Sequence, residues 1–137
     1  KNQGLTWSPV TRSTFEHVTS RFFIGRLLSG RLLWIRHGQP HERLSSRRAL
    51  TAFLSEDDGL TWSGGLLIDP RESVSYPDAA QSSDGRVFVI YDRERHDAKE
   101  ILMVELTEER ILSGQAVQSQ ERRIVNKANG IKRAFVP

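Results

Sequence analysis

One tyrosine and three arginines in this chain have side chains suited to binding and attacking an acidic substrate. They are Arg21, Arg36, Arg47 and Tyr76. A guanidinium group binds a carboxylate through two parallel hydrogen bonds, which a lysine ammonium group cannot do. A phenol can act as a nucleophile, but its ordinary pKa of ~10 means that it needs help to attack at neutral pH. These four residues predict a site for an anionic ligand if the fold brings them together.

Metal and cofactor chemistry has weaker support in the sequence. His37 and His41 are spaced like a pair of metal ligands, but they lie in a polar stretch, and we interpret them as solvated side chains. The chain has no cysteine, which excludes a disulfide framework and a thiolate metal site and fits a reducing compartment. We expect no metal and no cofactor.

The composition is that of one globular domain with little bias toward nucleic acid. Of 137 residues, 37% are hydrophobic and 27% are charged. The net charge of +3 comes from 20 basic and 17 acidic residues, and the arginines are scattered, so we expect no nucleic-acid partner. No apolar run approaches the ~20 residues of a membrane span, so we expect none.

An internal repeat organises the chain. The sequence GLTWS occurs at residues 4–8 and again at 59–63, and Gly30-Arg31 recurs as Gly85-Arg86. Both pairs have the same offset of 55 (59 − 4 and 85 − 30). A short apolar run follows each Gly-Arg copy, at residues 32–35 and at residues 87–90. Agreement in register between separate landmarks indicates a structural repeat.

Each repeat is expected to form short antiparallel strands. In the first unit we expect strands at 22–28, 31–35, 49–54 and 65–68; in the second, at 76–81 and 86–91, with a closing strand at 121–125. Residues 106–120 are interpreted as a helical turn or loop. Four short strands per ~50 residues is typical of a β-propeller blade. We therefore predict an all-β propeller of four-stranded blades, of which this chain forms about two and a half.

Residues 55–62 have the form S-x-D-x-G-x-T-W, which predicts a self-satisfied β-turn. Asp57 can accept backbone hydrogen bonds across the turn, Gly59 permits a positive φ, and Trp62 can pack beneath the turn with its N–H directed to a partner. A calcium loop is disfavoured because the EF-hand ligand spacing and its distal glutamate are missing.

This turn resembles the Asp-box, or BNR repeat, of the sialidases, and the resemblance covers nearly the whole chain. It implies a six-bladed propeller whose C-terminal part is residues 1–137, with the N-terminal blades absent. The segment 75–92 resembles the sialidase stretch that carries the tyrosine nucleophile, which puts Tyr76 there, with Asp92 at its acidic end. The segments 47–55 and 29–38 resemble stretches with substrate-binding arginines, which puts Arg47 and Arg36 in that role.

The chain also departs from the sialidase pattern. The glutamate that assists the nucleophile is expected one period before Tyr76, where this chain has Arg21, with Glu16 five residues earlier. Pro77 replaces the usual serine after Tyr76. The family's first arginine and its acid/base aspartate have no counterpart here, so we expect this piece alone to be inactive.

Strand alternation gives an independent reason to group the candidates. If the turn at 55–62 lies at one end of the sheets, the Ser29-Gly30 and Asp84-Gly85 turns lie there too. The strand ends near Arg21, Arg36, Arg47 and Tyr76 then share the opposite end.

The resemblance implies a retaining glycoside hydrolase that removes terminal sialic acid from glycans. The alternative is an Asp-box propeller that binds or cleaves another acidic glycan, or only binds one. The implied partner is a sialylated or other acidic glycan, and the uncovered sheet edges call for the missing N-terminal blades or self-association. The sequence leaves the compartment open, although this substrate class favours a secreted or periplasmic protein.

Overall fold

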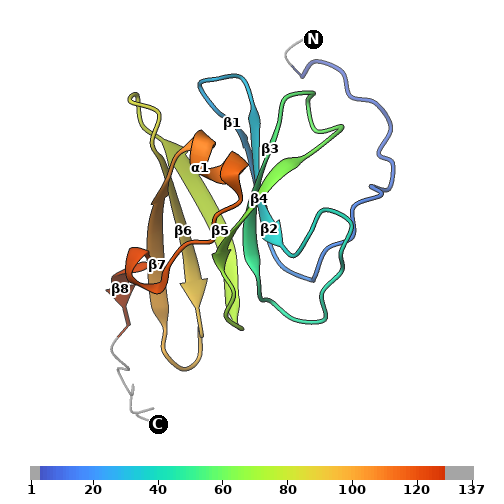
Figure 1. The fold of residues 1–137 in the computed structure, drawn as a ribbon. Helices are drawn as coiled ribbons and strands as arrows, with labels where there is room; N and C mark the ends of the chain where they lie inside the picture. Colours follow the sequence, from blue (N-terminus) through green and yellow to red (C-terminus); the bar gives the residue numbers. More distant parts are fainter. Residues whose placement is uncertain (1–3, 129–137) are drawn as a thin grey trace.

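The computed structural model describes residues 4–128 as two four-stranded antiparallel sheets, each a simple meander (Figure 1). The first sheet contains β1 (Phe23–Arg26), β2 (Leu32–His37), β3 (Leu50–Ser55) and β4 (Ser63–Asp69), in that order. The second contains β5 (Val74–Gln81), β6 (Val87–Arg93), β7 (Glu100–Leu106) and β8 (Arg123–Lys127). A short helix, α1 (Glu108–Ser113), and a 3₁₀ turn, η1 (Ser119–Glu121), lie between β7 and β8. The predicted all-β class, built from four-stranded antiparallel units, is confirmed.

The observed strands follow the predicted ones closely, with two differences. The closing strand β8 starts two residues later than expected, and β7 occupies residues to which the sequence interpretation assigned no strand. The expected helical turn within 106–120 is α1. It begins after Thr107, whose Oγ1 accepts a hydrogen bond from the Arg110 backbone N–H, and ends at Gly114 with φ of 68°. No helix in the described range is long and apolar enough to cross a membrane.

The repeat is visible in the geometry of the first hairpin of each sheet. In the β1–β2 turn, the N–H of Gly30 donates to the carbonyl of Leu27 at 2.9 Å, and Leu27 N–H donates to Arg31 at 2.9 Å. In the β5–β6 turn the same two bonds recur between Ser82, Gly85 and Arg86, at the same lengths. Gly30 and Gly85 both have φ of 90°, a conformation that side chains disfavour. The 55-residue offset therefore reflects equivalent turns.

The core lies between the two sheets and joins them. Fully buried side chains of β2 and β3, such as Leu33 and Leu54, belong to one cluster with Val89 of β6 and Leu102 of β7. The helix α1 adds Ile111, which is fully buried. At typical transfer energies, burial of each such side chain contributes ~1.5–3 kcal/mol. The sheets are therefore held together by apolar packing as well as by the connection between β4 and β5.

The two ends of the sheets carry different kinds of connection. One end, called the turn end, has the β1–β2 turn, the 55–62 turn, the β5–β6 turn and α1, all at the top of Figure 1. The other, called the loop end, has the loops 38–49, 70–73 and 94–99, at the bottom of the same view. The loop end is therefore the end to which strand alternation assigned the candidate residues.

The polar groups of the 55–62 turn form hydrogen bonds with one another, as predicted. The Thr61 N–H donates to Asp57 Oδ1 at 2.8 Å, and the hydroxyls of Ser55 and Thr61 also donate to this carboxylate. Ser55 Oγ in turn accepts the Gly59 N–H at 2.9 Å, where Gly59 has φ of 90°. The bonds from Thr61, followed by the one from Ser55, lower the pKa of Asp57 to about 2. The carboxylate is used within the turn, which is a scaffold role.

Trp62 packs beneath this turn, but its polar atom does not find the expected partner. The indole lies 4.8 Å from the ring of Trp34 and also covers Gly59. Its Nε1 is buried without a hydrogen-bond partner among the described residues, which corrects the expectation that it would have one. The ring serves packing alone. The first GLTWS copy precedes β1 and lies outside both sheets, and its Trp7 is 87% exposed.

Candidate functional site

Tyr76 lies on β5 at the loop end in an unusual backbone conformation. Its φ is 53°, although it is aromatic and precedes Pro77. It sits in a bulge, because the pairing of β5 with β6 breaks between Ser75 and Asp78. Its side chain is 42% exposed. Strained residues of this kind persist where the surrounding structure fixes them, and they cluster at functional sites.

Two guanidinium groups lie over the ring of Tyr76. Arg95 Cζ is 4.2 Å from the ring centroid and Arg47 Cζ is 5.5 Å from it. A hydrogen bond from Arg95, followed by the charge of Arg47, lowers the pKa of the Tyr76 phenol. Of the predicted arginines, Arg47 is thus the one that the structure brings to the tyrosine. Arg95 belongs to the charged stretch 92–97 and is not among the residues predicted for the site.

Each of these arginines is anchored by a neighbouring element. Arg47, in loop 38–49, donates from Nε and Nη2 to the carbonyl oxygen of Thr19, at 3.1 and 2.9 Å. Arg95, in loop 94–99, donates from Nε to Asp92 Oδ2 at 2.8 Å. Asp92, the predicted acidic end of the tyrosine segment, also accepts the Ser75 hydroxyl at 2.6 Å. The tyrosine is therefore flanked by cations whose positions are set by other residues.

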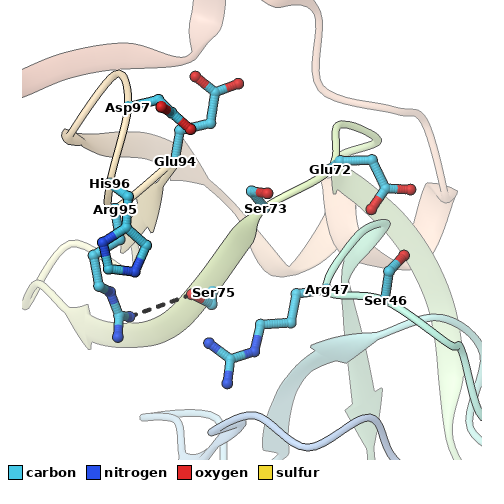
Figure 2. A pocket seen from close by; sticks show the side chains of 9 residues that line it. All are labelled: Ser46, Arg47, Glu72, Ser73, Ser75, Glu94, Arg95, His96 and Asp97. Atoms are coloured by element: carbon cyan, nitrogen blue, oxygen red, sulfur yellow. Dashed lines mark hydrogen bonds between the residues drawn. The ribbon is translucent and has the colours of Figure 1, made fainter.

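A pocket of about 300 Å³ opens beside this cluster, between the loops of the two sheets. Its lining residues come from the loops 38–49, 70–73 and 94–99 and from the start of β5: Ser46, Arg47, Glu72, Ser73, Ser75, Glu94, Arg95, His96 and Asp97. In Figure 2, Arg47 and Arg95 reach toward Ser75 from opposite sides, while the carboxylates of Glu72, Glu94 and Asp97 lie apart from them. The arginine side of the pocket can accept an anionic group through forked donors.

Arg36 is at the loop end but is not available to a ligand. It is fully buried, and its Nε donates to the carbonyl of His37 at 3.0 Å. Its terminal nitrogens donate to the carbonyls of Glu16, Pro40 and Glu42 at 2.5–2.7 Å. Its guanidinium stacks on Trp34, and burial lowers its pKa. These contacts tie loop 38–49 to the segment before β1 and leave no free forked edge.

Arg21 contacts β5 through Asp78 rather than through Tyr76. Its Nη2 is 3.6 Å from Asp78 Oδ2, and both side chains are more than half exposed. Asp78 is on β5, two residues after the tyrosine. Glu16, the residue considered as a possible helper of Tyr76, contributes its backbone carbonyl to Arg36, as described above. Among residues 4–128, the charged groups over the Tyr76 ring are therefore both cationic.

The histidine interpretation needs correction. His37 is not solvated: it is 1% exposed, and its ring Nδ1 donates to the carbonyl of Arg48 at 3.1 Å. Its backbone N–H donates to His17 Nε2 at 3.2 Å, so the imidazoles lie side by side. Burial lowers the pKa of His37 to about 4 and is also the main cause of the lowered pKa of His17. His41 is exposed and stacks on Phe15. Among the described residues, no group of three or more histidine, cysteine, aspartate or glutamate side chains is arranged to hold a metal ion.

One signal in the sequence could have identified Arg95. Loop 94–99 follows β6, so strand alternation places it at the loop end with Tyr76, and Arg95 follows the carboxylate of Asp92 by three residues. The burial of His37 had no comparable signal, because His17 is twenty residues away in the sequence.

Fold and site together define a repeat protein: all-β, built from four-stranded antiparallel units, with an Asp-box turn at one end and a strained tyrosine under arginines at the other. Residues 1–89 match the BNR repeat-like domain, and the chain belongs to this family. No curated protein and no solved structure matches the sequence. Membership of the family supports the sialidase resemblance at the level of the repeat.

Proposed function

We propose that the chain is part of a sialidase-like glycoside hydrolase that removes terminal sialic acid from glycans, with Tyr76 as its nucleophile. The observation that carries the proposal is the placement of Tyr76. It is strained, accessible and flanked by two guanidinium groups beside a pocket, in a chain of the BNR repeat-like domain family. A tyrosine nucleophile is also a known exception among retaining glycosidases.

The proposed chemistry follows from the charge of the substrate. Sialic acid carries a carboxylate on its anomeric carbon, and this carboxylate would repel a carboxylate nucleophile. The Tyr76 oxygen forms a bond to the anomeric carbon while the bond from that carbon to the leaving oxygen breaks. The leaving alcohol takes a proton from an acid, and water later releases the sugar from the tyrosine. We assign no residue of this chain as that acid.

The arginines have distinct roles in this proposal. Arg47 presents a partly exposed guanidinium at the pocket and is proposed to bind the substrate carboxylate. Arg21, paired loosely with Asp78, is proposed to add to the positive field at this end of the sheets. Arg36 is proposed to hold the shape of loop 38–49, because its donors are directed to backbone carbonyls.

Two substitutions, made in the complete protein of which this chain is proposed to be part, test the assignment in steady-state assays with a sialoside. Tyr76→Phe should abolish turnover and leave binding nearly unchanged, because it removes only the attacking oxygen. Arg47→Lys should weaken sialic acid binding about ten- to a hundredfold, since a charge-assisted bond is worth roughly 1.5–3 kcal/mol. Tyr76→Phe should therefore change mainly kcat, and Arg47→Lys should change mainly the affinity for the substrate.

Matched controls are available in the same chain. Arg43→Lys changes an exposed arginine in the same loop, and Tyr91→Phe changes the other tyrosine, which is buried away from the pocket. Normal turnover by Tyr76→Phe would refute the nucleophile assignment. Equal effects of Arg43→Lys and Arg47→Lys would refute the carboxylate-binding role.

A second candidate is an Asp-box protein that binds another acidic glycan without cleaving it. It is favoured by two observations: the groups over Tyr76 are both cationic, and Arg21 stands where the sialidase pattern has a glutamate. Binding of uronate-containing glycans that Arg47→Lys weakens, together with no sialoside turnover by the complete wild-type protein, would select this candidate.

A further inference from the structure

Arg95 lies closer to the ring of Tyr76 than the predicted Arg47 does, and it is bonded to side chains of β5 and β6. Its guanidinium donates twice to Asp92 Oδ2, from Nε at 2.8 Å and from Nη2 at 2.5 Å. The Nη2 atom also lies 3.5 Å from Ser75 Oγ, and the Ser75 hydroxyl donates to the other oxygen of Asp92 at 2.6 Å. Ser75, Asp92 and Arg95 thus form a closed set of contacts around one guanidinium.

The backbone fixes this set relative to the tyrosine. Ser75 and Asp92 are directly paired across β5 and β6, and Tyr76 is the next residue, at the start of the bulge. Loop 94–99 is closed by backbone bonds: Lys99 N–H donates to Glu94 at 2.8 Å, and Glu94 N–H donates to Ser73 at 3.0 Å. The guanidinium is therefore preorganised over the ring rather than carried on a free side chain.

The charges around the phenol favour its ionised form. Arg95 Cζ stands 4.2 Å from the ring centroid, and the charge of a phenolate is delocalised over that ring, so the cation attracts the phenolate more than the neutral phenol. Arg47 adds a second positive charge at 5.5 Å. Asp92 carries an opposing charge, and it is already bonded to Arg95 and Ser75. The pair of Arg21 and Asp78 lies farther along β5.

We propose that Arg95 is a positioning residue that stabilises the phenolate of Tyr76, so that the tyrosine loses its proton to water without a carboxylate base. The 42% exposure of the side chain lets water reach it. This inference deepens the proposed function and rests on it for its catalytic meaning, but the ionisation itself needs no substrate. If no carboxylate base is needed, Arg21 can stand at the position where a sialidase has its helper glutamate.

The lowered pKa of Tyr76 agrees with this arrangement. Its largest cause is a hydrogen bond from Arg95, followed by the charge of Arg47. The interaction is reciprocal, because Asp92 and then Tyr76 raise the pKa of Arg95. The other tyrosine behaves oppositely: Tyr91 donates to Asp69 at 2.9 Å, and burial raises its pKa.

The chain has two tyrosines, which makes the test direct. Phenolate formation is followed in the intact protein by ultraviolet difference absorbance and by carbon-13 NMR of labelled tyrosine rings. The wild type should show one transition below the ordinary tyrosine value of ~10 and one above it. Tyr76→Phe should remove the lower transition, and Tyr91→Phe should leave it in place.

Arg95 is then changed to Gln and to Lys, with Arg86→Gln as the matched control. Arg86 is also stacked on an aromatic ring, that of Phe88, but it lies at the turn end. Arg95→Gln should lower the phenolate fraction of Tyr76 near pH ~9 about threefold, an effect of the modest size expected for an exposed charge pair. Arg95→Lys should restore part of the effect, and Arg86→Gln should have none.

The outcomes separate this inference from the proposed function. A wild-type Tyr76 that titrates at the ordinary tyrosine value overturns the inference without any variant, even if sialosides bind. An equal response to Arg95→Gln and Arg86→Gln also overturns it, because net charge alone would then explain the titration. A lowered Tyr76 transition that depends on Arg95 supports the inference, and if the complete protein cleaves no sialoside, the hydrolase is refuted while the inference stands.

Discussion

The turn end and the loop end differ in which residues occupy the left-handed backbone region. At the turn end these positions are mostly glycines, as at Gly30, Gly59 and Gly85. At the loop end most of them carry side chains: Ala49, Ser73, Tyr76, Glu94 and Lys99. A side chain in this conformation costs roughly 1–2 kcal/mol. The loop end thus retains strain that the turn end avoids, which agrees with the proposal that the former carries the site and the latter is scaffold.

The largest expected effect is a loss of unfolding free energy at acidic pH, caused by a residue of the loop end. His37 is neutral and buried at the loop end, so the unfolded chain binds more protons than the folded protein between pH 6.5 and about 4. Stability should therefore be full above pH 6.5 and fall as the pH drops to 4, by about 3 kcal/mol. The check is urea unfolding across this range. His37→Asn should flatten the dependence and His41→Asn should not, whereas a wild type equally stable at both limits would contradict the prediction.

A smaller loss is expected from the turn end, where the hydrogen bonds are complete. Ser55→Ala leaves the Gly59 N–H without its 2.9 Å acceptor and removes a donor to Asp57. The expected cost is about 2 kcal/mol of unfolding free energy, measured by urea unfolding at neutral pH. Ser83→Ala, an exposed serine in the β5–β6 turn, is the control and should change stability by less than about 0.5 kcal/mol. Equal effects of the two would remove the scaffold role from Ser55.

The smallest effects should have opposite signs at the two ends. Gly30→Ala, at φ of 90° with open space around the added Cβ, should cost about 1 kcal/mol from backbone strain alone. Lys99→Gly, at φ of 53°, should gain less than about 1 kcal/mol, since relief of strain is partly offset by the entropy of glycine in the unfolded chain. Thermal unfolding measures both changes. A destabilised Lys99→Gly variant would show that the loop end is not strained at this position.

The sequence was most informative about the turn end. The 55-residue offset, the S-x-D-x-G-x-T-W pattern and the Asp-Gly turn all report local geometry, and each is found where expected. The strand β7 was not placed because its residues, EILMVEL, follow the charged stretch 92–97 without a turn signal between them.

The loop end was harder to predict because its contacts are long-range. Strand alternation brought Arg47 and Tyr76 to one end, but the sequence does not show that the donors of Arg36 meet carbonyls from residues 16, 40 and 42. It equally does not show that His17 packs on His37. Both depend on how the segment before β1 lies across β2, which is decided by tertiary packing.

The contact between Trp34 and Trp62 gives the protein an optical signature. Two indoles with centroids 4.8 Å apart and planes inclined by 47° couple their electronic transitions, which produces a paired positive and negative band in far-ultraviolet circular dichroism. The third indole, Trp7, is exposed, so a water-soluble quencher should reach its fluorescence first. The three tryptophans of the chain thus divide into a coupled pair that reports on the Asp-box turn and a single emitter that reports on the segment before the first strand.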